Sequence, residues 1–195
     1  MVSLGVTGGI GSGKSYVCSF FQKYNIPVFY TDDEAKKEMA SNIEIHKELK
    51  LLIGQDVVSA SGQIIKSVIS QYICKGEEYA NKVNAIVHPR VAQRFIRWKN
   101  SQESSIVAME CALLYESGFD KFVDYSILVT ALLETRIQRI IKRDLITREK
   151  AMEWINLQMS EEEKMKRSDF IIKNDGIIGI DIQLKEILDS ISYSK

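Results

Sequence analysis

The sequence predicts an α/β protein with a parallel five-stranded sheet in three layers, together with a helical insertion and a lid segment. Short apolar runs of strand type alternate with stretches of helical periodicity, the pattern of parallel strands joined by crossover helices. Hydrophobic residues make up 45% of the 195 residues and charged residues 27%, which is typical of a globular protein with a substantial core. The strands are expected at residues 2–6, 28–30, 106–109, 125–129 and 170–172.

The stretch between the second and third strands is longer than a single crossover helix needs. Helical patterns cover residues 33–100, with a break near residues 59–62. His88 and Pro89 are the residue types expected at an N-cap and at the first position of a helix, so a helix is predicted to begin there. We interpret residues 60–100 as a helical insertion within a single domain of residues 1–195. Extra packing helices without a ligand are the alternative.

The remaining helices follow the other strands. One begins at Ser15, and others are expected at residues 133–143, from Thr147 onward, and at residues 180–191. Ser160 and Glu163 have the spacing of a capping box, which predicts another short helix that starts at this point.

The charge balance and the cysteine count argue against several classes of protein. Lys plus Arg and Asp plus Glu both number 26, so no basic surplus indicates a nucleic-acid or membrane partner. Three cysteines without a C-x-x-C pair, and two histidines, favour neither a disulfide framework nor a zinc site. No apolar run approaches the roughly 18 residues of a spanning helix, and because the glycine-rich segment comes so early, no signal peptide is expected. A cytoplasmic location is expected, and the oligomeric state is left open.

Residues 8–15, Gly-Gly-Ile-Gly-Ser-Gly-Lys-Ser, match the phosphate-binding pattern G-x-x-x-x-G-K-[ST] between a strand and a helix. Glycines let main-chain amides approach phosphate oxygens closely, and the helix dipole adds positive potential. Lys14 offers a charge to the β- and γ-phosphates, and Ser15 offers a hydroxyl to Mg²⁺. A plain glycine turn is the alternative. The predicted ATP contacts here are Gly9, Gly11, Ser12, Gly13, Lys14, Ser15 and Tyr16.

Carboxylates follow two of the predicted strands. Asp32 comes directly after the second strand, where a parallel sheet places groups beside the phosphate loop, so it is a candidate to orient or deprotonate an acceptor hydroxyl. The alternative is that Thr31 or Asp32 only caps the next helix. Glu110 follows the third strand and is a candidate to bind hydrated Mg²⁺ through water. Glu116 is a second, more distant candidate.

Arginines cluster in the predicted lid, residues 134–160. Arg136, Arg139 and Arg143 share one helix face, with isoleucines on the opposite face, and Arg148 follows. Guanidinium groups stabilise the charge of a transferring phosphoryl group, although a solvated helix face is the alternative, above all for Arg136.

A second set of arginines has the same spacing in the insertion. For this set we favour a solvated face over recognition of a phosphorylated acceptor. The set comprises Arg90, Arg94 and Arg97.

The chain resembles the dephospho-coenzyme A kinase family over nearly its whole length. Three positions depart from that family: Tyr30 replaces the first aspartate of Asp-Ala-Asp, Ala112 replaces a proline, and Tyr16 replaces a threonine. The matching segments are residues 6–15, 88–89, 113–116, 147–149, 158–160 and 169–172, together with Asp32, Arg139, Lys142, Arg143, Asp144, Asn174 and Gly176.

This resemblance implies a P-loop kinase that uses ATP with Mg²⁺ to phosphorylate the 3′-hydroxyl of dephospho-coenzyme A, the last step of coenzyme A synthesis. It implies that Asp32 accepts or orients the hydroxyl proton and that Lys14, Arg139 and Arg143 stabilise the phosphates. Asn174 would line the adenine pocket, the insertion would hold the acceptor, and the lid would close over both. A kinase for another nucleoside or small alcohol, or a non-catalytic nucleotide-binding switch, are the competing hypotheses.

Overall fold

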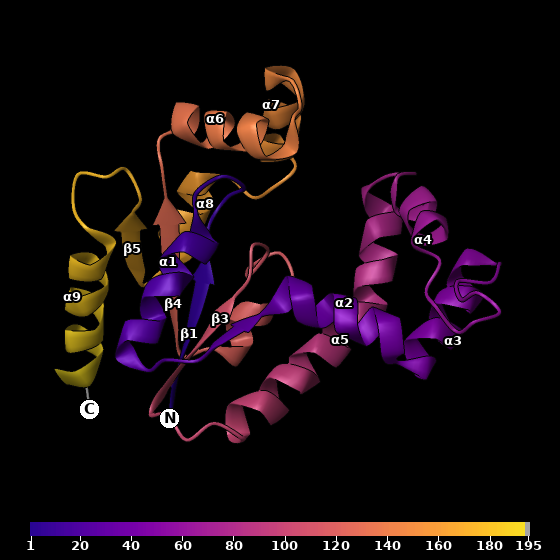
Figure 1. The fold of residues 1–195 in the computed structure, drawn as a ribbon, viewed down its shortest axis with the longest axis horizontal. Coiled ribbons are helices and arrows are strands. Elements are labelled where there is room, and N and C mark those ends of the chain that lie inside the picture. Colours follow the sequence, from indigo (N-terminus) through magenta and orange to yellow (C-terminus); the bar gives the residue numbers. More distant parts are fainter. Residues whose placement is uncertain (194–195) are drawn as a thin grey trace. The chain divides into compact units, whose positions relative to one another are not determined.

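The computed structural model describes residues 1–193, which group into two compact units. The first, which we call the sheet unit, comprises residues 1–29 and the chain from residue 102 onward. The second, the helical unit, comprises residues 30–101 and so takes in residues 30–59 as well as the expected insertion of residues 60–100. Figure 1 traces the elements of each unit along the chain.

The sheet unit contains the sheet strands except for Tyr30, the last residue of β2, at which the helical unit begins. The strands are β1 (Val2–Thr7), β2 (Val28–Tyr30), β3 (Ile106–Glu110), β4 (Tyr125–Thr130) and β5 (Phe170–Lys173). They form one sheet in the order β2-β3-β1-β4-β5. β1 runs parallel to β3 and β4, and β4 runs parallel to β5. All six residues of β1 are buried, as expected for a central strand that helices cover on both faces. The predicted parallel α/β sheet is therefore confirmed.

The helices of the sheet unit are α1 (Lys14–Phe20), η1 (Phe21–Tyr24), η2 (Phe119–Phe122), α6 (Leu133–Asp144), α7 (Arg148–Asn156), α8 (Glu161–Arg167) and α9 (Ile180–Tyr193). The connection through α1 leads from β1 to β2, whereas the connection through α6, α7 and α8 leads from β4 to β5, in the opposite direction across the sheet. Because parallel crossovers are almost always right-handed, α1 and α8 lie on opposite faces. α9 packs against α1, and α8 packs against β4, which completes three layers (Figure 1).

The helical unit contains α2 (Thr31–Ser41), α3 (Ile43–Ile53), α4 (Lys66–Ile73) and α5 (Glu77–Asn100). α5 packs against each of the other three helices. Asn42 begins α3, because its side chain accepts hydrogen bonds from the amides of Glu44 and Ile45 at 3.1 and 3.3 Å. Leu49 of α3 and Phe95 of α5 are fully buried and contribute to the core of this unit.

Pro89 lies inside α5, so the predicted helix start at His88 is wrong. A proline has no amide hydrogen for the carbonyl four residues earlier, and helices often bend at such a position. α5 changes direction along its length in Figure 1. Val87 and Val91 on either side of Pro89 are buried, and this packing holds the helix together across the missing hydrogen bond.

The cysteines occupy different environments. Cys18 and Cys111 are buried, whereas Cys74 is exposed on the helical unit, and all three are free thiols. None of the helices within residues 1–193 combines the length and the apolar character needed to cross a bilayer.

Two leucines of α3 provide a matched test of the core of the helical unit. Leu49 is 0% exposed and Leu51 is 84% exposed. We expect Leu49→Ala to lower the free energy of unfolding by about 2–5 kcal/mol, because it leaves a cavity. Leu51→Ala is expected to change it by less than about 0.5 kcal/mol. Urea denaturation followed by circular dichroism measures both, and equal losses would contradict the packing of α3.

Candidate nucleotide site

The segment between β1 and α1 forms a tight loop of residues 8–13, which we call the phosphate loop. It joins the carboxyl end of a central strand to a helix N-terminus, as the sequence pattern predicts. Gly11 and Gly13 have φ angles of +80° and +92°, which side chains rarely allow. The amide of Ser12 donates to the carbonyl oxygen of Gly9 at 3.1 Å and closes a turn within the loop.

The same two glycines lie where a side chain would collide with a neighbouring segment. A Cβ atom on Gly11 would lie 2.6 Å from the carbonyl oxygen of Arg136 in α6. A Cβ atom on Gly13 would lie 2.2 Å from the side-chain nitrogen of Asn174, which follows β5. The phosphate loop is therefore packed closely between α6 and the end of β5.

Three consecutive carbonyl groups of the phosphate loop accept hydrogen bonds from distant side chains. Because the C=O and N–H groups of one peptide point in opposite directions, these bonds turn the amides that follow toward the other side of the loop. The Ser12 amide closes the turn to Gly9, so the amides of Gly11 and Gly13 are the ones that this arrangement directs toward an anion. The bonds run from Arg136 Nε to Ile10 (3.0 Å), from Arg139 Nη1 to Gly11 (3.3 Å) and Ser12 (3.1 Å), and from Asn174 Nδ2 to Ser12 (2.8 Å).

The residues at the start of α1 lie beside this loop. The ammonium group of Lys14 donates to the carbonyl oxygen of Gly8 at 2.9 Å, so it folds back over the loop. Ser15 is exposed in the first turn of the helix. Tyr16 is 56% exposed, and its ring contacts Phe20 edge to face with 5.2 Å between centroids. The ring of Tyr16 therefore lies outside the core.

Arg139 and Asn174, two residues predicted to contact the nucleotide, lie together at this loop. Besides its bonds to the loop, Arg139 donates from Nη2 to the carbonyl oxygen of Asn174 at 3.2 Å. Asn174 is 7% exposed and packs against Gly13. The structure thus brings the end of β5, the middle of α6 and the phosphate loop into one site.

Arg136 is buried, so the alternative of a solvated helix face is wrong for this residue. It is 6% exposed, and its Nη1 forms an ion pair with Glu161 at 2.9 Å. The absence of a side chain on Gly9 makes room for it, because a Cβ atom there would lie 2.1 Å from Arg136 Nη2.

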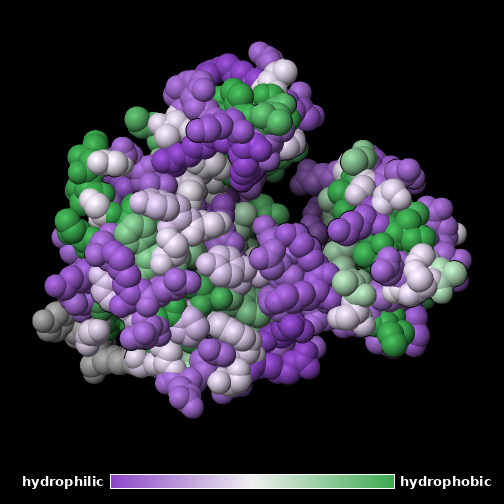
Figure 2. Space-filling model, in the orientation of Figure 1, coloured by the Kyte–Doolittle hydropathy of each residue, from purple (hydrophilic) through white to green (hydrophobic). Residues whose placement is uncertain are grey.

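The segment formed by α6 and α7 carries the other predicted arginines on its surface. Arg143 is exposed and pairs with Asp144 at 2.8 Å. Arg148 donates two hydrogen bonds to Glu134, at 2.7 and 2.8 Å, and these bonds lower the pKa of Glu134 to about 2. Figure 2 shows hydrophilic residues around a hydrophobic patch on this segment. The buried cluster that joins the two helices comprises Ile137, Ile140 and Ala151.

Glu110 ends β3 close to the start of α1. It is 7% exposed. Burial raises the pKa of the Cys18 thiol on α1, the Glu110 carboxylate raises it further, and the Lys14 ammonium group lowers it. Both charged groups therefore lie near Cys18.

Glu116, the second candidate to bind magnesium, is occupied by other partners. Its carboxylate accepts the amide of Met159 at 3.1 Å and pairs with Lys164, also at 3.1 Å. Lys164 is 1% exposed and donates a further bond to the carbonyl oxygen of Ala112 at 3.1 Å. These contacts favour a structural role for Glu116.

Asp32 belongs to the helical unit and is exposed in the first turn of α2, directly after β2. The N-cap of α2 is Tyr30, and no side chain caps this helix. The alternative in which Thr31 or Asp32 serves as the N-cap is therefore wrong. The role of Asp32 toward an acceptor stays a prediction.

Two of the three arginines predicted on one face of α5 have carboxylate partners within the helical unit. Arg90 pairs with Glu48, and Arg94 pairs with both Glu34 and Glu38, the latter at 3.1 Å. Burial raises the pKa of Glu34, but hydrogen bonds from Lys37 and Arg94 together lower it by more, so the pKa lies below its ordinary value. Because these guanidinium groups already have anionic partners, recognition of a phosphorylated acceptor is not supported here.

Sequence reasoning missed several residues that support the phosphate loop. Gln158 accepts the amide of Ile10 at 2.8 Å, and Glu161 pairs with Arg136. Gln158 lies in a segment that resembles the family, but the pattern does not indicate its partner. Lys164 lies among charged residues of α8, and no local signal distinguishes a buried lysine from a solvated one.

Comparison with known proteins agrees with this geometry. The family model described as dephospho-CoA kinase matches residues 2–179. A dephospho-CoA kinase from Bacteroides fragilis is 40% identical over 188 residues, which cover 96% of this chain and 91% of that protein.

Two solved structures have similar folds. TT1252 from Thermus thermophilus superposes with a TM-score of 0.82 at 30% identity, covering 97% of each chain. Dephospho-CoA kinase from Campylobacter jejuni has a TM-score of 0.71 at 22% identity, covering 98% of each chain.

Gly11 and Gly62 provide a matched test of the packing around the phosphate loop. Both have a φ of +80°, but a Cβ atom on Gly62 would meet nothing within 4 Å. We expect Gly62→Ala to cost about 1–2 kcal/mol of backbone strain and to leave ATP binding unchanged. Gly11→Ala should weaken ATP binding strongly, because it pushes the loop away from α6. Calorimetric titration with ATP and Mg²⁺ measures this difference, and equal affinities of the two variants would refute it.

Proposed function

The chain belongs to the dephospho-CoA kinase family, and from this premise we propose that it transfers the γ-phosphate of ATP to the 3′-hydroxyl of dephospho-CoA. The observation that carries the proposal is the phosphate loop, whose carbonyl groups are held from outside so that amides remain for phosphate oxygens. The product would be coenzyme A. The proposal places the reaction in the cytoplasm.

The phosphate loop would bind the triphosphate chain of ATP. Lys14 folds back over this loop, and its ammonium group is placed to exchange the Gly8 carbonyl for phosphate oxygens. Arg139 is exposed beside the loop and would add a second positive charge, with Arg143 one turn further along α6. These cations would stabilise the charge that spreads over the transferring phosphoryl group.

The residues present fit ATP bound with Mg²⁺. Ser15 presents an exposed hydroxyl at the end of the phosphate loop, and the carboxylate of Glu110 lies near the start of α1. The hydroxyl of Ser12 is buried and has no hydrogen-bond partner among residues 1–193, which a phosphate or a water molecule would supply. Ser15 would hold the ion directly and Glu110 through water, since Mg²⁺ prefers oxygen ligands. When bound, Mg²⁺ neutralises charge on the β- and γ-phosphates.

The adenine ring would lie beside Asn174 and the loop that follows β5. That loop carries apolar side chains on its surface, since Ile177 is 83% exposed and Ile178 is 51% exposed. Figure 2 shows hydrophobic surface over the region between β5 and α9. Exposed apolar groups next to a buried amide are suited to a flat, polar-edged ring.

Asp32 would accept or orient the proton of the 3′-hydroxyl. A carboxylate does this work in phosphoryl transfer, and Asp32 follows β2 at the carboxyl edge of the sheet. The helical unit would bind the rest of the acceptor. Residues 134–160 would close over both substrates and keep water from the γ-phosphate, since water would otherwise hydrolyse ATP.

The test of this proposal is an assay of purified protein with ATP, Mg²⁺ and dephospho-CoA, coupled to the release of ADP. We expect turnover that depends on the acceptor. A panel of other nucleosides and small alcohols distinguishes a kinase of different specificity. Slow ATP hydrolysis that no acceptor stimulates would instead support a nucleotide-dependent switch.

Lys14→Ala tests the proposed grip on the triphosphate. We expect kcat/KM to fall on the order of 100- to 1000-fold, because one preorganised charge at the transferring phosphate is removed. Lys23→Ala is the matched control, since Lys23 is exposed on η1 and pairs with Asp181 at 3.3 Å. Steady-state kinetics compares the two variants, with circular dichroism as a check of folding. Unchanged kinetics of Lys14→Ala would remove this residue from the mechanism.

Asp32→Asn tests the proposed activation of the hydroxyl. A lost general base lowers kcat by about 100- to 10,000-fold, with ATP affinity preserved. Asp33→Asn is the control at the adjacent position, because Asp33 is exposed and pairs with Lys36 at 2.9 Å. If Asp32→Asn turns over dephospho-CoA at a near-normal rate, Asp32 is not the base.

A further inference from the structure

Arg136 lies in a position that is unfavourable for a charge without compensating partners. Its side chain is 7% exposed, and a guanidinium group stays protonated. Nε donates to the carbonyl oxygen of Ile10 at 3.0 Å, and Nη1 donates to the carboxylate of Glu161 at 2.9 Å. A buried charge that loses such a partner destabilises its surroundings. These two bonds therefore fix Arg136 between the phosphate loop and α8.

The carbonyl and the amide of Ile10 both form hydrogen bonds with side chains of the predicted lid, residues 134–160. Arg136 binds the carbonyl oxygen, and Gln158 accepts the amide at 2.8 Å. Gly9 allows this approach, because a Cβ atom there would overlap Nη2 of Arg136 at 2.1 Å. With the Ile10 carbonyl held by Arg136, the amide of Gly11 in the same peptide points the other way.

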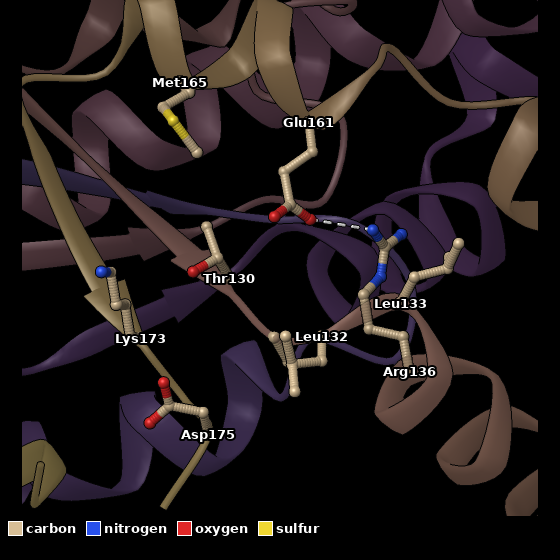
Figure 3. A pocket seen from close by; sticks show the side chains of 9 residues that line it. Thr130, Leu132, Leu133, Arg136, Glu161, Met165, Lys173 and Asp175 are labelled. Atoms are coloured by element: carbon tan, nitrogen blue, oxygen red, sulfur yellow. Dashed lines mark hydrogen bonds and ion pairs between the residues drawn. The ribbon is translucent and has the colours of Figure 1, made fainter. Parts of the chain in front are cut away.

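The ion pair of Arg136 and Glu161 lies between two pockets. A pocket of about 540 Å³ opens beside the ends of β4 and β5, and a second of about 260 Å³ lies next to Gly9 and Gln158. Arg136 and Glu161 line both pockets. Figure 3 shows their side chains joined on one side of the larger pocket, with Lys173 and Asp175 on another. Because a pocket lies on either side of the pair, the ion pair itself connects α6 to α8 at this point.

Glu161 is the first residue of α8, and the start of this helix is held in place by hydrogen bonds. The capping box of Ser160 and Glu163 begins α8 at Glu161. One turn later, the buried Lys164 ties α8 to the carbonyl oxygen of Ala112, which follows β3. The carboxylate that Arg136 binds is therefore fixed relative to the sheet.

We propose that Arg136 is a positioning residue, which through its ion pair with Glu161 sets the conformation of the phosphate loop that binds ATP. It acts through the peptide between Ile10 and Gly11 and has no role in recognising the acceptor. The inference rests on the proposed function, because ATP is the ligand whose binding it alters. Loss of the pair lets this peptide rotate and weakens ATP binding, while the acceptor site is unaffected.

The experiment compares Arg136→Met and Glu161→Gln with the wild-type protein. Arg136→Met keeps the volume and removes every donor, whereas Glu161→Gln keeps the shape and removes the charge. Glu162→Gln is the matched control, because Glu162 is the exposed neighbour of Glu161 on α8. Calorimetry with ATP and Mg²⁺ gives Kd, and steady-state kinetics gives KM for each substrate. Thermal unfolding gives the loss of stability separately.

We expect both variants to raise the Kd and KM for ATP by about 10- to 100-fold, with KM for dephospho-CoA unchanged. The double variant should be no worse than Arg136→Met, because the two residues act as one unit. Lower thermal stability with a normal Kd for ATP would overturn the inference and leave only a structural role. If Arg136→Met fails to fold, Glu161→Gln alone decides. Wild-type protein that does not bind ATP would overturn the proposed function as well.

Discussion

Hydrogen bonds to the carbonyl groups of the phosphate loop are the interactions on which the candidate site depends. A loop can turn its amides toward an anion only if its carbonyl oxygens find donors on the other side. Here the donors are two arginines of α6 and an asparagine after β5, so the loop conformation depends on residues far away along the chain. The glycines of the loop have two roles. They adopt backbone angles that other residues rarely allow, and the missing side chain lets these donors approach the loop.

The sequence predicted the sheet unit well because the relevant signals are local. Parallel strands buried on both faces are short apolar runs in the sequence, and all five strands begin at the residues expected. The glycines and the lysine of the phosphate loop form a recognisable local sequence pattern. The capping box at Ser160 and Glu163 is likewise a signal that spans four residues, and it is present in the structure.

What the sequence did not predict depends on partners far away along the chain. Arg136 has the spacing of a solvated helix face, and only the position of Gly9 and Glu161 in space shows that it is buried. Pro89 has the local preference of a helix start, but buried valines on both sides keep it within α5. Lys164 is buried because a carbonyl oxygen and a carboxylate meet it there, which no helical pattern encodes.

The positive side chains near the phosphate loop divide into two kinds. Arg136 is enclosed and paired with a carboxylate, so its charge is largely neutralised. Arg139 is exposed and bound only to neutral carbonyl oxygens among the contacts described, so its charge remains available to a ligand. Two guanidinium groups one turn apart on α6 thus serve different ends: the first supports the backbone, and the second contributes electrostatic potential.

The exposure of Cys74, with Cys18 and Cys111 buried, gives the chain one accessible attachment point for a maleimide dye. Cys74 is the C-cap residue of α4 and belongs to the helical unit. A fluorophore at Cys74 would therefore report on the helical unit without any engineered cysteine. Its emission, followed while nucleotide and acceptor are added in turn, would time the steps of substrate arrival in the unmodified sequence.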